Sequence, residues 1–188
     1  MGKTSMSPAG RGAVHDLRRS HLQTLRILST TSFILTVFLT YAASQLPLFD
    51  SSPGVLLSQT DGALAKAAFP LLRWDAFHFL HIAQEGYVYE HEWAFFPGTP
   101  FVMRTLGEVL RRLCNSEQST AAHLLVGGGL ASVLCGTTTT LYDLTMHHFS
   151  SPSIAYLTCL LSLLPSSPAI LRFSAFTEPF FTYFSYRG

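Results

Sequence analysis

The chain has 188 residues, of which 48% are hydrophobic and only 12% are charged, and its formal net charge at pH 7 is +1. Soluble domains carry about 25% charged residues, so this composition favours a protein that resides in lipid. The near-neutral charge and the lack of long Lys/Arg runs exclude an extended phosphate-tracking surface, and we expect no nucleic-acid partner.

The N-terminal part predicts a leader followed by a first membrane span. Residues 1–24 are rich in Ser, Gly and basic residues, which indicates a flexible leader. Residues 25–49 hold no charge between Arg26 and Asp50 and are long enough for the ~20 helical residues that cross a bilayer. A cleaved signal peptide is the alternative, but this run is longer than the ~7–15 apolar residues of a typical signal sequence. The basic leader predicts a cytosolic N-terminus.

A polar segment, residues 50–120, follows and is expected on the lumenal side. It contains RWDAFHFLHIAQEGYVYEHEWAFFPGTP, in which acids, imidazoles and aromatic rings are concentrated. At 100° per residue, a helix here places several side chains on one face: Asp75, His78, His81, Ile82 and Glu85. We therefore expect an amphipathic helix at the membrane interface, ended by Gly86.

Later apolar segments predict further spans. Residues 121–141 form the second predicted span, whose small residues let helix backbones approach closely in lipid. A short cytosolic loop, residues 142–153, leads to a third span at residues 154–173 that prolines break, and residues 174–188 begin a truncated fourth span. The predicted fold is all-α: a polytopic membrane protein with three to four transmembrane helices.

The polar cluster of the loop allows several interpretations. It could be a solvated face. It could hold a metal, since His78 and His81 are three residues apart and Glu90–Glu92 could add ligands, which would give a metal-dependent membrane hydrolase that binds zinc. No HExxH pattern supports that reading, and the stretch lacks a Ser or Cys nucleophile for a triad. A transporter would place its ionisable groups inside the spans. A non-catalytic membrane subunit, using the loop for assembly or lipid binding, is a further alternative.

The loop also resembles a known family. Its pattern W-D-x-x-H-F-L-x-I-A-x-x-G-Y-x-x-E-H-x-x-A-F-F-P is similar to the first lumenal loop of the PIG-V mannosyltransferases of glycosylphosphatidylinositol (GPI) anchor synthesis. The resemblance continues more weakly through LYDLT at residues 141–145 and SAFTEPFFTYFS at residues 174–185. In the last segment Thr177 stands where the family has a Ser before the Glu.

The resemblance implies a multi-pass protein of the endoplasmic reticulum (ER) membrane, part of a larger fold of the GT-C type. Family members transfer mannose from dolichyl-phosphate mannose, in α-1,6 linkage, to a GPI intermediate on the lumenal side. Such an enzyme needs more spans than three or four, so we expect this chain to be an N-terminal fragment or a truncated gene model, and activity of the chain alone is not implied. The resemblance is also compatible with a small membrane protein as a partner subunit.

The resemblance also implies roles for individual residues. Conversion of a β-mannosyl phosphate to an α-mannoside inverts the anomeric carbon, so one general base suffices, and Asp75 is the candidate. His78 is expected to orient Asp75 or contact phosphate, and Arg73 to offset phosphate charge. The other candidate substrate-binding residues are Trp74, Glu90, His91 and Glu178. The donor carries no nucleotide diphosphate, so we expect no cofactor and no obligatory metal.

Overall fold

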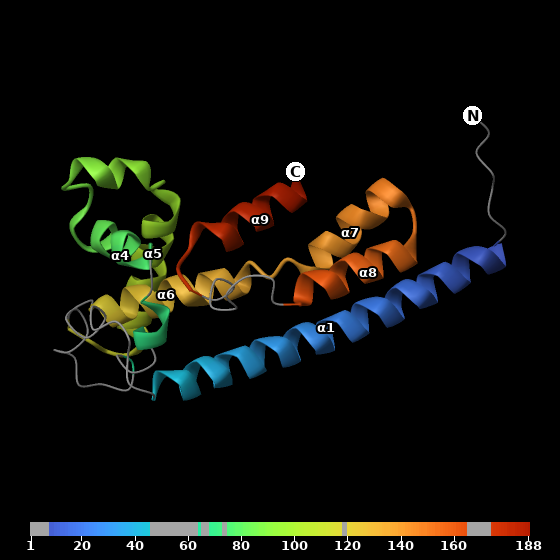
Figure 1. Cartoon of the computed structure of the whole chain (residues 1–188), viewed down its shortest axis with the longest axis horizontal. Helices are drawn as coiled ribbons and strands as arrows, with labels where there is room; N and C mark the ends of the chain where they lie inside the picture. The colour runs from blue at the N-terminus through green and yellow to red at the C-terminus, as the bar shows by residue number, and fades with distance from the viewer. Residues whose placement is uncertain (1–7, 46–63, 65–67, 73–74, 118–119, 165–173) are drawn as a thin grey trace. The chain divides into compact units, whose positions relative to one another are not determined.

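The computed structural model describes residues 8–45, 64, 68–72, 75–117, 120–164 and 174–188 (Figure 1). Within these ranges all regular structure is helical, which confirms the predicted all-α class. The chain divides into two compact units. One comprises residues 1–35, 137–166 and 186–188, and the other comprises residues 36–136 and 167–185.

The first unit is built from α1 (Pro8–Ser44) as far as Leu35, together with α7 (Thr138–Phe149) and α8 (Pro152–Leu163). Its buried core consists of Leu25, Tyr142, Ala155 and Cys159. Polar contacts also join the helices. The Arg18 guanidinium donates a hydrogen bond to the Asp143 carboxylate at 2.7 Å. Nδ1 of His21 lies 3.3 Å from the Tyr142 hydroxyl, and the same ring stacks on Tyr156.

Helix α1 differs from the predicted leader and span. The helix begins at Pro8, so residues 8–24 are helical and continuous with the apolar segment, whereas the sequence predicted a flexible leader. Contacts from α1 to α7 and α8 stabilise this extra length. Residues His15–Leu39 are long and apolar enough to cross a membrane. Ile27, Ile34 and Phe38 are about 60% exposed, which suits contact with lipid tails.

The second predicted span is divided. Helix α6 (Ala121–Leu134) ends where the N–H of Gly136 bonds to the Val133 carbonyl at 3.1 Å, and α7 begins at Thr138. Glycine is a poor helix former, which favours a break here. The predicted loop at residues 142–153 is consequently mostly helix. The stretch Ala121–Phe149 is the second one long and apolar enough to cross a membrane.

The third and fourth predicted spans are only partly described. Helix α8 is apolar but has 12 residues, fewer than a membrane crossing needs. Residues 165–173, where proline was expected to break the third span, lie outside the described residues. Residues 177–187 form α9 (Thr177–Arg187), a short helix at the position of the predicted fourth span.

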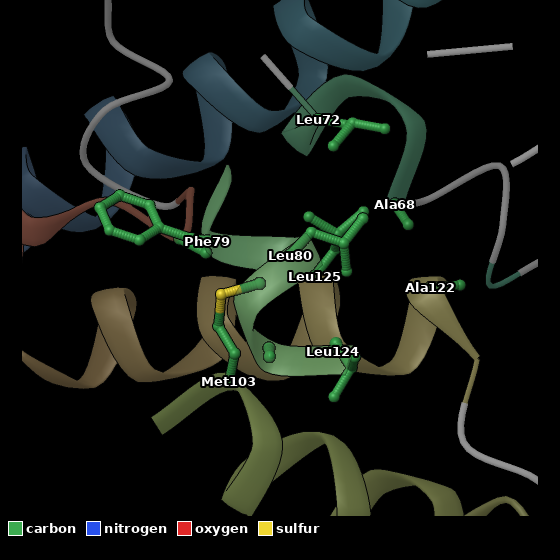
Figure 2. Close-up of a cluster of buried hydrophobic side chains, with 10 residues drawn as sticks. Ala68, Leu72, Phe79, Leu80, Met103, Ala122, Leu124 and Leu125 are labelled. Atoms are coloured by element: carbon green, nitrogen blue, oxygen red, sulfur yellow. The ribbon is translucent and has the colours of Figure 1, made fainter. Parts of the chain in front are cut away.

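The second unit packs the polar loop against α6. Its elements are η1 (Phe69–Leu71), α4 (Ala76–Glu85), η2 (Glu90–Ala94), α5 (Gly98–Leu113), α6 and most of α9. Helix α4 contacts both α5 and α6. Figure 2 shows Leu80 of α4 beside Leu125 of α6, with Met103 of α5 in the same cluster; all three are fully or almost fully buried.

Glycines set the distance between α5 and α6. A Cβ on Gly127 would lie 2.5 Å from the backbone nitrogen of Gly107, and a Cβ on Gly128 would lie 2.6 Å from the Ala175 Cβ. The backbones therefore meet where only glycine fits. Ser132 then donates to the Ser174 carbonyl at 2.7 Å, which ties the segment before α9 to α6. The close approach expected from small residues in this segment is confirmed.

Candidate active site

Helix α4 presents the predicted polar residues on the surface of the second unit. The chain enters it through Asp75, the residue before the first helical turn, and leaves at Gly86, whose φ of 84° favours glycine. The Gly86 N–H closes the helix on the Ile82 carbonyl at 2.9 Å, so the predicted end is confirmed. Ile82 is 4% exposed and packs inward, which corrects its expected place on the polar face.

The two proposed catalytic side chains have different surroundings. Asp75 is exposed, and its carboxylate makes no capping bond to the N–H groups of α4. His78 stacks on Phe95, with ring centroids 4.7 Å apart and planes at 21°. No hydrogen bond joins Asp75 and His78 in the described part of the chain, so the structure gives His78 an aromatic partner instead. Arg73 and Trp74, the predicted substrate-binding residues before Asp75, lie outside the described residues.

Glu92 is a buried carboxylate that links η2 to α4. It is 1% exposed. One carboxylate oxygen accepts the N–H groups of Val88 and Tyr89, each at 2.9 Å, and the other contacts Nδ1 of His81. The hydrogen bond from the Tyr89 N–H is the largest of the causes that hold the pKa of Glu92 below its ordinary value. Sequence reasoning considered Glu92 only as a metal ligand and missed this role.

Rings extend from this carboxylate across the surface. His81 stacks on Tyr89 at 5.5 Å, Tyr89 stacks on His91 at 5.7 Å, and the His91 ring meets His78 edge-on at 5.5 Å. Three rings, those of His81, Tyr89 and His91, thus connect the buried Glu92 to His78, one turn from Asp75. His91 and Glu90, both predicted substrate-binding residues, are exposed at the start of η2.

Beside this row, the aromatic residues after α4 hold the loop together and are partly exposed. Tyr87 stacks on Trp93 at 4.7 Å and donates its hydroxyl to the Phe95 carbonyl at 2.6 Å. Burial, with the nearby Glu92 charge second, raises the pKa of Tyr87 above its ordinary value, so the hydroxyl stays a donor. Trp93 is 72% exposed, and its open face is available to a ligand or to lipid.

The segment before α9 enters the same unit. Ser174 is buried and donates to the Leu71 carbonyl at 2.7 Å, so it joins η1 to the end of the chain. The Thr177 hydroxyl lies 3.4 Å from that of Thr99 at the start of α5. Glu178 follows, exposed in the first turn of α9. The structure therefore brings the Glu178 segment against the start of α5.

A shared metal site is not formed by the predicted pair of histidines. His81 is bound to Glu92, whereas His78 stacks on Phe95. Within the described ranges, no group of three or more His, Cys, Asp or Glu side chains is placed to hold a metal ion. What the described surface offers is an exposed carboxylate at Asp75 with imidazoles and aromatic faces nearby in the chain.

Comparison with known proteins gives one family over most of the chain. Residues 19–188 match the family described as Mannosyltransferase (PIG-V). The chain is 39% identical over 145 residues, or 76% of its length, to "GPI mannosyltransferase 2" of Cryptococcus neoformans var. neoformans serotype D, of which that match covers 32%. It is 35% identical over 160 residues, or 84% of its length, to "GPI mannosyltransferase 2" of Gibberella zeae, covering 36% of that protein.

An animal relative is also similar. The "GPI alpha-1,6-mannosyltransferase 2" of Cricetulus griseus is 38% identical over 119 residues, which is 62% of this chain and 24% of that protein. The chain thus spans about a third or less of the length of the curated relatives it matches. No solved structure matches the chain significantly.

Proposed function

Since the chain belongs to the PIG-V mannosyltransferase family, we propose that it contributes the Asp75 loop to an enzyme that adds the second mannose of a GPI anchor. Transfer runs from dolichyl-phosphate mannose to a GPI intermediate, in α-1,6 linkage. The similar proteins named as GPI mannosyltransferases support the reaction class, and the name of the Cricetulus griseus relative includes the α-1,6 linkage.

The reaction takes place on the lumenal side of the ER membrane. The basic residues at the start of α1 favour a cytosolic N-terminus, and the helical stretch His15–Leu39 is long enough to carry the chain across once. That topology supports a lumenal position for α4 and η2. A lipid-linked donor and a lipid-linked acceptor then both reach the loop from the bilayer. A small membrane subunit is a further partner of this assembly.

The observation that carries the proposal is the position of Asp75. It is an exposed carboxylate at the start of α4, inside the segment whose pattern resembles the family loop. In the proposed step an acceptor hydroxyl attacks the anomeric carbon as its proton passes to Asp75. The bond from that carbon to the phosphate oxygen breaks, and dolichyl phosphate leaves with the electron pair. One displacement inverts the anomeric centre and needs one base.

The remaining candidates are assigned roles in substrate binding. His91 and Glu90 contact sugar hydroxyls from η2, and Glu178 contacts the substrate from α9. His78 contributes an aromatic ring one helical turn after Asp75. Arg73 and Trp74 precede Asp75 in the chain; Arg73 offsets the phosphate charge, and Trp74 packs against a face of the sugar. Phosphate is already a good leaving group, so neither a metal nor an organic cofactor is required.

The proposal is tested with Asp75→Asn in the full-length enzyme that contains this chain, expressed in cells that lack the second GPI mannosyltransferase. The amide keeps the size of the side chain but cannot take a proton, so surface display of GPI-anchored proteins should be lost at normal protein level. Glu117→Gln, an exposed acid outside the site, is the matched control and should rescue fully. Normal rescue by Asp75→Asn would exclude Asp75 as the base.

A further inference from the structure

Glu92 has the surroundings of a group with a specific task. Among the described residues it is the one buried acidic side chain, and a buried carboxylate is costly unless hydrogen bonds satisfy it. Two backbone N–H groups and one imidazole do so. A loop could be closed by apolar packing at lower cost, so the carboxylate indicates a requirement for defined geometry.

The contact with His81 fixes the orientation of that ring. Nδ1 lies against the carboxylate and donates to it, so Nε2 occupies the opposite edge of the imidazole, and the side chain is 38% exposed. A buried carboxylate that holds one imidazole nitrogen sets both the tautomer and the direction of the other nitrogen. Nε2 of His81 therefore points in a fixed direction at the surface, whereas an exposed histidine without this contact could rotate.

The orientation of His81 also sets the rings beyond it. Its face stacks on Tyr89, whose own N–H is bound to Glu92, so this tyrosine is held at backbone and side chain. Tyr89 stacks on His91, and His91 meets His78. Movement of Glu92 would release the first ring of this row and shift two candidate site residues with it.

We propose that Glu92 is a positioning residue, which acts through His81 to hold the rings of Tyr89, His91 and His78 in the arrangement that receives the sugar substrate. This inference rests on the proposed function, and it adds His81 to the substrate-facing groups. Glu92 itself touches no substrate. Its effect is on binding geometry, because a displacement of about 1 Å at a site can cost as much as ~100-fold in rate.

Two substitutions of His81 separate positioning from simple loss of a ring. In His81→Asn the amide nitrogen lies near the place of Nδ1 and can still donate to Glu92, whereas His81→Gln carries its amide near the place of Nε2. If Glu92 acts through Nδ1, Asn should preserve the loop better than Gln. Both variants keep Glu92 in place, so the comparison remains valid if substitution of Glu92 prevents folding.

The test combines two measurements on the assembled enzyme that contains this chain, in detergent-permeabilised microsomes so that the protease reaches the lumenal loop. Chymotrypsin cleavage between residues 88 and 96 reports the loop, and mannose transfer gives KM and kcat. We expect Glu92→Gln and His81→Gln to raise the cleavage rate several-fold and KM about tenfold, with a smaller change in kcat. We expect His81→Asn, which keeps a donor to Glu92 but loses Nε2, to raise KM as well while its cleavage rate stays closer to that of the wild type. Glu117→Gln serves as the control and should change neither measurement.

The outcomes distinguish this inference from the proposed function. A wild-type KM in Glu92→Gln would overturn the positioning role, even if cleavage becomes faster. Equal increases in cleavage rate in His81→Asn and His81→Gln would also overturn it, because the Nδ1 contact would then have no effect on the loop. Absence of mannose transfer by the wild-type form of the assembled enzyme that contains this chain would overturn the proposed function itself, and the inference with it.

Discussion

Substitution of Gly127 by Ala tests the closest contact in the second unit, the crossing of α5 and α6. The added Cβ would lie 2.5 Å from the Gly107 nitrogen, 2.8 Å from the Leu106 carbonyl carbon and 3.0 Å from the Gly107 Cα. Ordinary contacts between such atoms are about 3.5–4.0 Å. The obstructing atoms belong to the backbone, so no side-chain rotation relieves the overlap and the helices must separate by roughly 1 Å.

The expected cost follows from two opposing effects. Overpacking of this kind costs about 1–3 kcal/mol, and a backbone obstacle favours the upper end of that range. Alanine in a helix interior returns about 1 kcal/mol relative to glycine. The net loss is therefore about 2 kcal/mol, which lowers the Tm of a chain of this size by roughly 4–8 °C.

The assay is thermal unfolding of the purified chain in detergent micelles. Gly136→Ala is the control, because its nearest atom, the Val133 carbonyl oxygen, lies 3.4 Å from the added Cβ. That variant should unfold within about 2 °C of the wild type, since surface changes usually cost less than about 0.5 kcal/mol. A Tm for Gly127→Ala equal to or above that of the wild type would refute the close approach of α5 and α6.

Two further predictions concern the core and the loop. Leu125→Ala, at a fully buried position, should destabilise the chain by about 2–5 kcal/mol in the same assay, whereas Leu130→Ala, at a position 49% exposed, should cost much less; equal losses would contradict the assigned core. Because hydrogen bonding, first from the Tyr89 N–H, lowers the pKa of Glu92, its stabilisation of the loop is complete above the ordinary value of 4.5 and is lost as pH falls through the lowered value. Tryptophan emission should show this acid transition in the wild type but not in Glu92→Gln, and an identical transition in both would assign it to another group.

Features that depend on residues adjacent in the sequence were predictable from the sequence alone. The all-helical class follows from long apolar segments, and the end of α4 follows from Gly86, whose backbone conformation other residues avoid. The predicted start of the first helix was wrong for residues 8–24, because their charged and polar side chains were interpreted as a flexible leader. Arg and Leu are good helix formers, and contacts such as Arg18 with Asp143 fix the segment on α7.

The candidate site was predictable only in part. The loop pattern identified Asp75, His78, Glu90 and His91 without reference to any partner in space. The periodicity of α4 placed Ile82 among the polar residues, but α4 packs against both α5 and α6, which buries a wider face than a helix at an interface would. Helix α5 itself was not predicted, because its charged residues Arg104, Glu108, Arg111 and Arg112 concealed its apolar side.

The sequence by itself determined the class of the protein, its apolar segments and the family pattern of its loop, because composition and residue order carry these properties directly. The tertiary structure decided that Glu92 is buried against His81, that Ser174 joins η1 to α6, and that Gly107 meets Gly127. Such contacts join elements that can be far apart in the chain. Local periodicity tells which side of a helix is apolar, but only packing decides which element covers it.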